Sequence, residues 1–338
     1  MLRKIGWALA AVGAAYAARS LLRGMRSFDY KDKVVVISGG SRGLGLVLAR
    51  QLAAQGAKLA LLSRDELKLR EAARQLQSLR ADVSYHVCDI RNEAQVQSTI
   101  SSVLARFGRI DVLINDAGVI QVGPIETMTA EDYRNAMDTH FYGPLYLTMT
   151  VLPHMRAQKF GRIANISSIG GKLSVPHLLP YSASKFALVG FSEGLRAELM
   201  KDNVLVTTIC PGMMRTGSHV NAEFKGNNKG EFAWFSIGNG LPVASVSAEK
   251  AASQILHAVQ RGDAELIISI QAQAAAKFNA LFPGVTADMM SVVNFILPRA
   301  DGEDKSTKLG HESQSMFAPS LLTKMSDDQI EVNNEAPM

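Results

Sequence analysis

After Lys33 the chain alternates short runs of β-branched residues with longer stretches of helical periodicity, and this alternation restricts the possible fold most strongly. Parallel strands require crossover connections, which are usually helices, so strands and helices that alternate along a chain predict a parallel sheet. Several of the runs are continuously apolar, which is typical of strands covered by helices on both faces. The pattern therefore predicts an α/β protein with a doubly wound parallel sheet.

The boundaries of these elements follow from the periodicity and from the Gly and Pro positions. The expected strands are Val34–Ser38, Lys58–Leu62, Val83–Cys88, Val112–Asn115, Arg162–Ser167, Val204–Cys210 and Glu265–Ser269. The expected helices are Leu44–Gln55, Glu66–Leu79, Glu93–Phe107, Ala130–Met155, Tyr181–Met200 and Ala248–Arg261. About seven strands flanked by helices make a Rossmann fold, which we place over residues 29–270 in the strand order 3-2-1-4-5-6.

Two further segments follow the predicted domain. Residues 271–300 show helical spacing of apolar residues interrupted by Pro283-Gly284, so we expect a helical extension there. The tail over 301–338 holds three basic residues against eight acidic ones and has little periodicity. We expect this acidic tail to be disordered.

An apolar segment with basic flanks precedes the domain. Residues 5–18 are uncharged and mostly alanine; as a helix they would be about 21 Å long, short of the ~30 Å hydrocarbon core. We expect residues 1–28 to associate with a membrane by spanning it or by lying on it. A cleaved signal peptide and a helix packed on the domain are the alternatives. Basic residues after the run place the body of the protein in the cytoplasm.

Charge and cysteine content exclude other classes of protein. The net charge is +5 and the pI is about 9.1, but the densest basic cluster flanks the apolar segment, which does not predict nucleic-acid binding. The two cysteines are too few for a zinc site, and the seven histidines show no pair at ligand spacing. We therefore expect no metal.

A glycine-rich turn joins the first expected strand to the first helix. Glycines there let a pyrophosphate approach bare backbone amides at a helix N-terminus, which predicts a dinucleotide site. The residues expected to bind at this turn are Gly39, Ser41, Arg42, Gly43, Leu44 and Gly45. The second strand ends at Arg64, where an acid would mark NAD. Arg64 and Arg42 suit a 2′-phosphate, so NADP(H) is the favoured cofactor. Asp89 either accepts from the adenine amino group or caps the next helix.

Three further residues carry candidate chemistry. Tyr181 and Lys185 lie one turn apart on one helix face, and Ser168 ends the fifth strand at the edge where such sheets bind ligands. A lysine and an oxidised nicotinamide would stabilise the phenolate of a tyrosine whose ordinary pKa is about 10. Ser168 would hold the substrate oxygen while Tyr181 transfers the proton.

Together these motifs resemble the short-chain dehydrogenase/reductase family, single-domain type, over about Lys33 to Ser269. The resemblance also rests on Asn115-Asp116-Ala117-Gly118 after the fourth strand and on Pro211-Gly212 with Thr216 after the sixth. It implies that Ser168, Tyr181 and Lys185 are catalytic. It further implies cofactor contacts by Asn115, Ala117, Gly118, Tyr181, Lys185, Pro211, Gly212 and Thr216.

Two positions depart from the family pattern. Asp116 replaces the usual Asn, which is a modest change because that motif acts largely through its backbone. His140 stands where the family has its fourth catalytic residue, an Asn three residues before a Gly. We include His140 among the candidate catalytic residues because its imidazole would hold the relay water that feeds Lys185. An altered relay and neutral drift are the alternatives.

The expected activity is NADP(H)-dependent interconversion of an alcohol and a ketone or aldehyde. Aromatic and Met residues concentrated over 213–246 favour an apolar pocket and hence a lipophilic substrate, as in lipid metabolism; a self-packed lid is the alternative. The alternatives are a 3-oxoacyl-thioester reductase and an NADPH-binding protein without turnover. The family resemblance implies a homo-dimer or homo-tetramer through the helices at 130–156 and 181–200.

Overall fold

Seven parallel strands form the central sheet of the computed structural model, which describes residues 7, 13–14, 17–18, 20–300 and 305–337. In order across the sheet they are β3 (Val83–Val87), β2 (Lys58–Ser63), β1 (Val34–Ser38), β4 (Val112–Asn115), β6 (Gly161–Ile166), β7 (Val204–Pro211) and β11 (Glu265–Ile268). This order confirms the predicted doubly wound Rossmann topology, in which β1 and β4 meet where the winding direction reverses.

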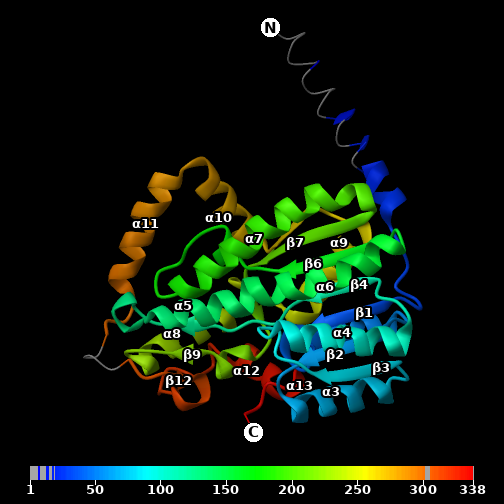
Figure 1. Ribbon diagram of the computed structural model, residues 1–338. Coiled ribbons are helices and arrows are strands. Elements are labelled where there is room, and N and C mark those ends of the chain that lie inside the picture. The colour runs from blue at the N-terminus through cyan, green and yellow to red at the C-terminus, as the bar shows by residue number, and fades with distance from the viewer. Residues whose placement is uncertain (1–6, 8–12, 15–16, 19, 301–304, 338) are drawn as a thin grey trace.

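Helices cover both faces of the sheet (Figure 1). One face packs against α2 (Gly43–Ala54), α3 (Glu66–Ser78) and α9 (Ala248–Arg261), and the other against α4 (Glu93–Phe107), α6 (Gly143–Ala157) and α7 (Leu179–Leu199). Side chains of β1 alternate between the two cores: Val35 and Ile37 belong to the first and Val34 and Val36 to the second. Each such buried side chain contributes about 1.5–3 kcal/mol, which explains the unbroken apolar strands.

The helix predicted over Ala130–Met155 is interrupted, which corrects the sequence interpretation. It consists of α5 (Ala130–Met137), a π-helical turn over Asp138–Tyr142, and α6. Pro144 causes the break because it has no N–H to donate to the carbonyl four residues earlier, that of His140. The turn places His140 in the interior of the protein.

Two helices extend the domain beyond the sheet, as the sequence predicts. They are α10 (Ile270–Leu281) and α11 (Pro283–Ile296), and they form a hairpin that projects from the body (Figure 1). Asn279 ties α10 to the carbonyl of Lys172 at 2.9 Å. This contact holds the hairpin beside the loop that leads into α7.

The prediction of a disordered tail is wrong for residues 305–337. Strand β12 (Lys308–Leu309) pairs with β9 (Glu223–Phe224), and the short helices α12 (Lys324–Asp327) and α13 (Gln329–Val332) follow. Ala318 and Thr323 are fully buried. The tail packs through single side chains in irregular backbone rather than through a helical face, so it shows no periodicity although it is anchored.

Half of the predicted membrane segment, residues 1–6, 8–12, 15–16 and 19, lies outside the described residues. Within the described part of the chain, no helix has the length and apolar character needed to cross a membrane.

Arg23 forms an ion pair with Asp263, and Phe28 stacks edge-on against buried Tyr30. Cys88 and Cys210 are buried free thiols.

Candidate active site

A cleft of about 470 Å³ opens at the carboxyl ends of the central strands, where α/β sheets bind ligands. It is bounded by the glycine turn, the loop after β4, helix α7 and the segment after β7. Thirteen predicted site residues line it: Gly39, Ser41, Arg42, Gly43, Leu44, Arg64, Asp89, Ala117, Gly118, His140, Tyr181, Lys185 and Thr216.

Five predicted residues do not line the cleft. A Cβ on Gly45 would clash with the carbonyl of Gly39, so this glycine lets α2 approach the turn closely. Asn115 is buried and donates to Asn165 at 2.8 Å, which links β4 to β6. The other three predicted residues that do not line the cleft are Ser168, Pro211 and Gly212.

Tyr181 and Lys185 stand on the first turns of α7 and face the cleft. The Lys185 Nζ lies 5.6 Å from the centre of the Tyr181 ring and donates to the carbonyl of Ile166 at 2.8 Å. Burial raises the pKa of Tyr181 to about 12, against which a hydrogen bond with Ser168 acts. Ser168 Oγ is itself fixed by the N–H of Gly170 at 3.0 Å. The predicted spacing therefore brings all three side chains together.

Asp116 adds a carboxylate that the sequence interpretation treated as a backbone position. Burial lowers the pKa of Lys185 to about 8, while the charge of Asp116 raises it. Burial likewise raises the pKa of Asp116 to about 7, while Lys185 lowers it. Each group therefore favours the charged form of the other in a site that disfavours both charges. In the sequence, the only indication that this side chain has a role was that Asp116 replaces the Asn usual in the family.

His140 has a different role from the one predicted. Its Nε2 accepts from the N–H of Val119 at 3.1 Å, so its Nδ1 carries the proton and donates to Ser184 Oγ at 2.7 Å. Both ring nitrogens are thus used within the protein, and neither is left to hold the relay water expected from the sequence. We correct that expectation: His140 is a positioning residue that fixes the loop after β4 against α7.

A pH dependence of stability follows from the burial of His140. Burial lowers the pKa of His140 well below its usual range, and Lys185 lowers it further. Below about pH 6.5 the unfolded state takes up a proton that the folded state refuses, so the free energy of unfolding should fall with decreasing pH. Urea titrations of the wild type and His140→Gln should show a shallower acid-side loss in the variant. Identical slopes would contradict the assignment of a buried neutral imidazole.

Two of the residues expected to contact the adenosine part of a cofactor, Arg42 and Asp89, are held by charged partners. Arg42 pairs with Glu335 at 3.5 Å, and Arg64 is exposed at the cleft rim. The Asp89 carboxylate is bound by Arg91 at 2.6 Å, which lowers the pKa of Asp89. Asn92, rather than Asp89, caps α4, so the helix-cap alternative for Asp89 is wrong.

The fold and the site geometry agree with a comparison against protein families. The model of the short chain dehydrogenase family matches residues 33–225, which is more than half of the chain. The chain belongs to the short-chain dehydrogenase family. The match covers the glycine turn, the loop after β4, the Ser168, Tyr181 and Lys185 cluster and the segment after β7.

Curated relatives and solved structures agree with this family. A dehydrogenase/reductase SDR family protein 7-like from Anopheles gambiae is 35% identical over 260 residues, covering 75% of this chain and 80% of the relative. Dehydrogenase/reductase SDR family member 7B from Danio rerio is 37% identical over 217 residues, covering 62% and 70%. A short-chain dehydrogenase from Streptomyces avermitilis superposes with a TM-score of 0.66 at 28% identity, covering 78% of this chain and 98% of that structure.

Members of this family bind a nicotinamide cofactor, and the cleft fits one. Gly39 and Gly43 have φ of +78° and +56°, which lets the backbone of the turn face the cleft without a side chain. A Cβ on Gly43 would clash with the carboxylate of Glu335, which lies directly against this glycine. One solved relative, an actinorhodin polyketide ketoreductase at 27% identity, was determined with NADPH, and a structure of the same fold was determined with NAD. The family therefore leaves the choice between them to the residues of each chain.

Proposed function

We propose that this protein is an NADP(H)-dependent oxidoreductase that interconverts an alcohol and a ketone or aldehyde on a lipophilic substrate. One observation carries the proposal: Tyr181 and Lys185 line the same cleft as Arg42 and Arg64, and Ser168 is hydrogen-bonded to Tyr181. A protein that only bound the cofactor would need neither Ser168 nor Tyr181.

The side chains divide the proton chemistry among them. Ser168 holds the substrate oxygen next to the Tyr181 hydroxyl, which donates its proton in reduction and accepts one in oxidation. The ammonium group of Lys185 favours the phenolate form of Tyr181, and Asp116 keeps that ammonium charged. When bound, the nicotinamide supplies or accepts the hydride.

The choice of NADP(H) rests on the end of β2. An acid at this place would hydrogen-bond the 2′-hydroxyl of NAD, but the chain has Arg64, and Arg42 follows in the glycine turn. Guanidinium groups bind phosphate oxygens with charge-assisted hydrogen bonds. These two residues support a 2′-phosphate at the cleft rim.

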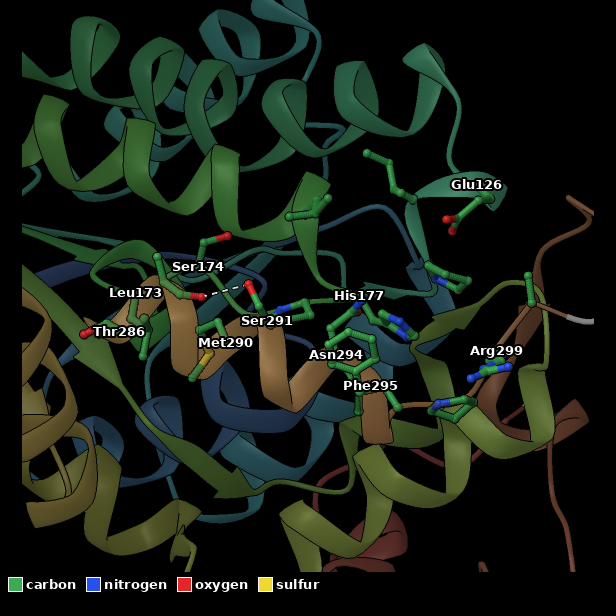
Figure 2. Close-up of a pocket in the computed structure, with 18 of the residues that line it drawn as sticks. Glu126, Leu173, Ser174, His177, Thr286, Met290, Ser291, Asn294, Phe295 and Arg299 are labelled. Carbon is green, nitrogen blue, oxygen red and sulfur yellow. Dashed lines mark hydrogen bonds between the residues drawn. The ribbon is translucent and has the colours of Figure 1, made fainter. Parts of the chain in front are cut away.

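A second cavity supports a large lipophilic substrate. It measures about 1080 Å³ and lies between α11 and the loop that connects β6 to α7 (Figure 2). Apolar residues such as Leu173, Phe186, Met290 and Phe295 line it, and His177 joins its wall, held by Glu231 at 2.7 Å. Ligand cavities usually measure about 300–1,000 Å³, so this space suits a substrate with a long or bulky apolar part.

The loop over 213–246 contributes less to the substrate site than expected. Phe224, Phe232 and Phe235 are buried against one another and form a core of their own. This favours the self-packed alternative for these aromatic residues. The apolar surface offered to a substrate comes from α11 instead.

Filling the cavity should separate long substrates from short ones. Met290→Trp adds bulk to the lining and should lower kcat/KM by about 10-fold for substrates with long apolar tails, since the packing of even one methylene is worth about 1–3 kcal/mol. Short ketones should be affected less than twofold. Met289→Trp is the matched control because Met289 is the preceding residue of α11 and is exposed. Equal losses for short and long substrates would contradict this use of the cavity.

A 3-oxoacyl-thioester reductase is the second candidate. A granaticin polyketide synthase putative ketoacyl reductase from Streptomyces violaceoruber is 37% identical over 185 residues, which favours this reading. A carrier-bound substrate would require basic residues at the mouth of the cavity. The lining contains the acidic Glu126 as well as the basic Arg299. We therefore rank it second, and thioesters belong in the substrate panel.

We also propose membrane association through residues 1–28 and a homo-oligomer through the helical regions 130–156 and 181–200, which contain α5, α6 and α7. The basic and apolar pattern of the N-terminal residues supports the membrane association, and exposed Met149 and Phe186 support the oligomer.

Deleting residues 1–26 should move the protein from the membrane fraction to the soluble one with cofactor binding intact. A wild-type protein already soluble without detergent would contradict the membrane proposal, and a monomer in sedimentation would contradict the oligomer.

A further inference from the structure

The end of the C-terminal tail lies inside the cofactor cleft. Glu335 is only 2% exposed and Asn333 is fully buried, although both follow a polar and acidic stretch. Glu335 lines the same cleft as the glycine turn, Tyr181 and Lys185. The end of the tail, although polar, is therefore buried in the candidate active site.

The tail makes its polar contacts with the glycine turn itself. The N–H of Gly43 donates to the carbonyl of Asn333 at 2.9 Å, and the Asn334 side chain donates to the carbonyl of Ser41 at 2.9 Å. Gly43 begins α2, so its N–H is one of the free helix-terminal donors that bind phosphate in folds of this class. The tail thus uses a donor on which a dinucleotide depends.

The carboxylate of Glu335 lies at the glycine turn, where a phosphate of a dinucleotide would be expected to bind. It lies beside Gly43, where a Cβ would come within 2.5 Å of Oε1, and it pairs with Arg42 at 3.5 Å. The Asn221 side chain donates to Oε2 at 2.7 Å. An ionised carboxylate is buried at low cost only where donors and opposite charge surround it, and the same surroundings suit a phosphate.

The rest of the tail is anchored away from the glycine turn. His219 binds Asp327 at 2.9 Å, and the N–H of Gly310 donates to the carbonyl of Ala222 at 2.9 Å. The end of the tail also has contacts outside the turn: Lys68 donates to the carbonyl of Ala336, Arg50 donates to that of Val332, and Asn333 donates to that of Thr216. A segment tethered this close returns to the turn at a high effective concentration.

We propose that residues 333–337, led by Glu335, compete with the phosphates of the nicotinamide cofactor for the glycine turn and so set its affinity. The inference rests on cofactor binding at this cleft. It deepens the proposed preference for NADP(H), because Glu335 forms an ion pair with Arg42, one of the two residues proposed to bind the 2′-phosphate. The tail end must leave the turn before the phosphates enter. The apparent dissociation constant is then the intrinsic one divided by the fraction of molecules with the tail displaced.

Cofactor titrations test the competition without any turnover. We would measure the dissociation constants of NADPH and NADH by fluorescence for the wild type, Glu335→Gln and a chain ending at Val332. If the tail is displaced in about one molecule in ten, both changes should tighten NADPH binding by up to ~10-fold. Glu331→Gln is the matched control, because Glu331 lies four residues earlier in the tail and is exposed. It should bind NADPH as the wild type does.

Hydrogen exchange over residues 329–337 gives a second and direct readout. Saturating NADPH, or inorganic pyrophosphate at high concentration, should speed exchange in this segment because both displace it. Slower exchange with NADPH, or weaker NADPH binding after truncation, would mean that the tail clamps the cofactor and would overturn the proposal. Unchanged affinity in both variants would overturn it as well.

The two readouts also separate this proposal from the proposed function. If NADH binds as tightly as NADPH and still speeds exchange over 329–337, the cofactor preference fails and the competition stands. If NADPH is preferred but exchange does not rise, the competition fails and the preference stands.

Discussion

Replacing Tyr181 with Phe should slow hydride transfer by about 10²–10⁴-fold, the usual contribution of a positioned proton donor. The change keeps the ring and its packing against His140 and removes only the hydroxyl that meets Ser168. Binding of the cofactor should change less than twofold, because no phosphate contact is lost. Single-turnover rates and a parallel cofactor titration measure the two effects separately.

Tyr85→Phe provides the control for Tyr181→Phe. Tyr85 lies on the edge strand β3 and is 38% exposed, so its hydroxyl has no part in the chemistry. Near-wild-type turnover in Tyr181→Phe would remove the assignment of the proton donor.

The same site gives the pH dependence of the wild-type rate. The pKa of Lys185 is lowered by burial to about 8, so its charge is present below that pH and lost above it. Tyr181, with its pKa raised to about 12, remains protonated throughout. Reduction should therefore slow as pH rises through about 8, because the phenolate that forms has lost its cation.

Cofactor choice should reverse when Arg64 becomes an acid. Arg64→Asp places a carboxylate at the end of β2, where it repels a 2′-phosphate and accepts from a 2′-hydroxyl. We expect the affinity for NADPH to fall by about 10²-fold, as for a lost charge-assisted pair with added repulsion, and that for NADH to rise. Competition binding with the two cofactors measures both changes.

Arg74→Asp is the matched control for Arg64→Asp. Arg74 lies on α3 and is 73% exposed, and its partner is Glu71, so the same change of charge occurs away from the cleft. A preference of the wild type for NADH would show that Arg42 and Arg64 are solvated surface residues.

The sheet was predictable because its signals are local. β1 is apolar over Val34–Ile37 and is followed directly by a glycine turn, a pattern typical of a buried strand that leads into a helix. The spacing of Tyr181 and Lys185 likewise determines that they share a helix face. Pro144 is a local indication of the break before α6, but the helical periodicity on both sides of it favoured one continuous helix.

Two features of the site were not predictable, for a common physical reason. The carboxylate of Asp116 matters because folding buries it near Lys185, and Glu335 matters because the tail folds back onto Gly43. Neither contact follows a helical or strand period, and the acidic composition of the tail is typical of disorder. Contacts between irregular backbone and a distant turn leave no trace in a single sequence.

The most direct test of the central claim is deuterium transfer in a single turnover. NADPH labelled at the transferable C4 position is mixed with the enzyme and a panel of lipophilic ketones, aldehydes and 3-oxoacyl thioesters. The account predicts that deuterium appears on the carbinol carbon of the alcohols formed from the lipophilic ketones or aldehydes, and that Tyr181→Phe abolishes most of this transfer. Tight NADPH binding with no deuterium in any product would contradict it and leave a protein that binds the cofactor without turnover.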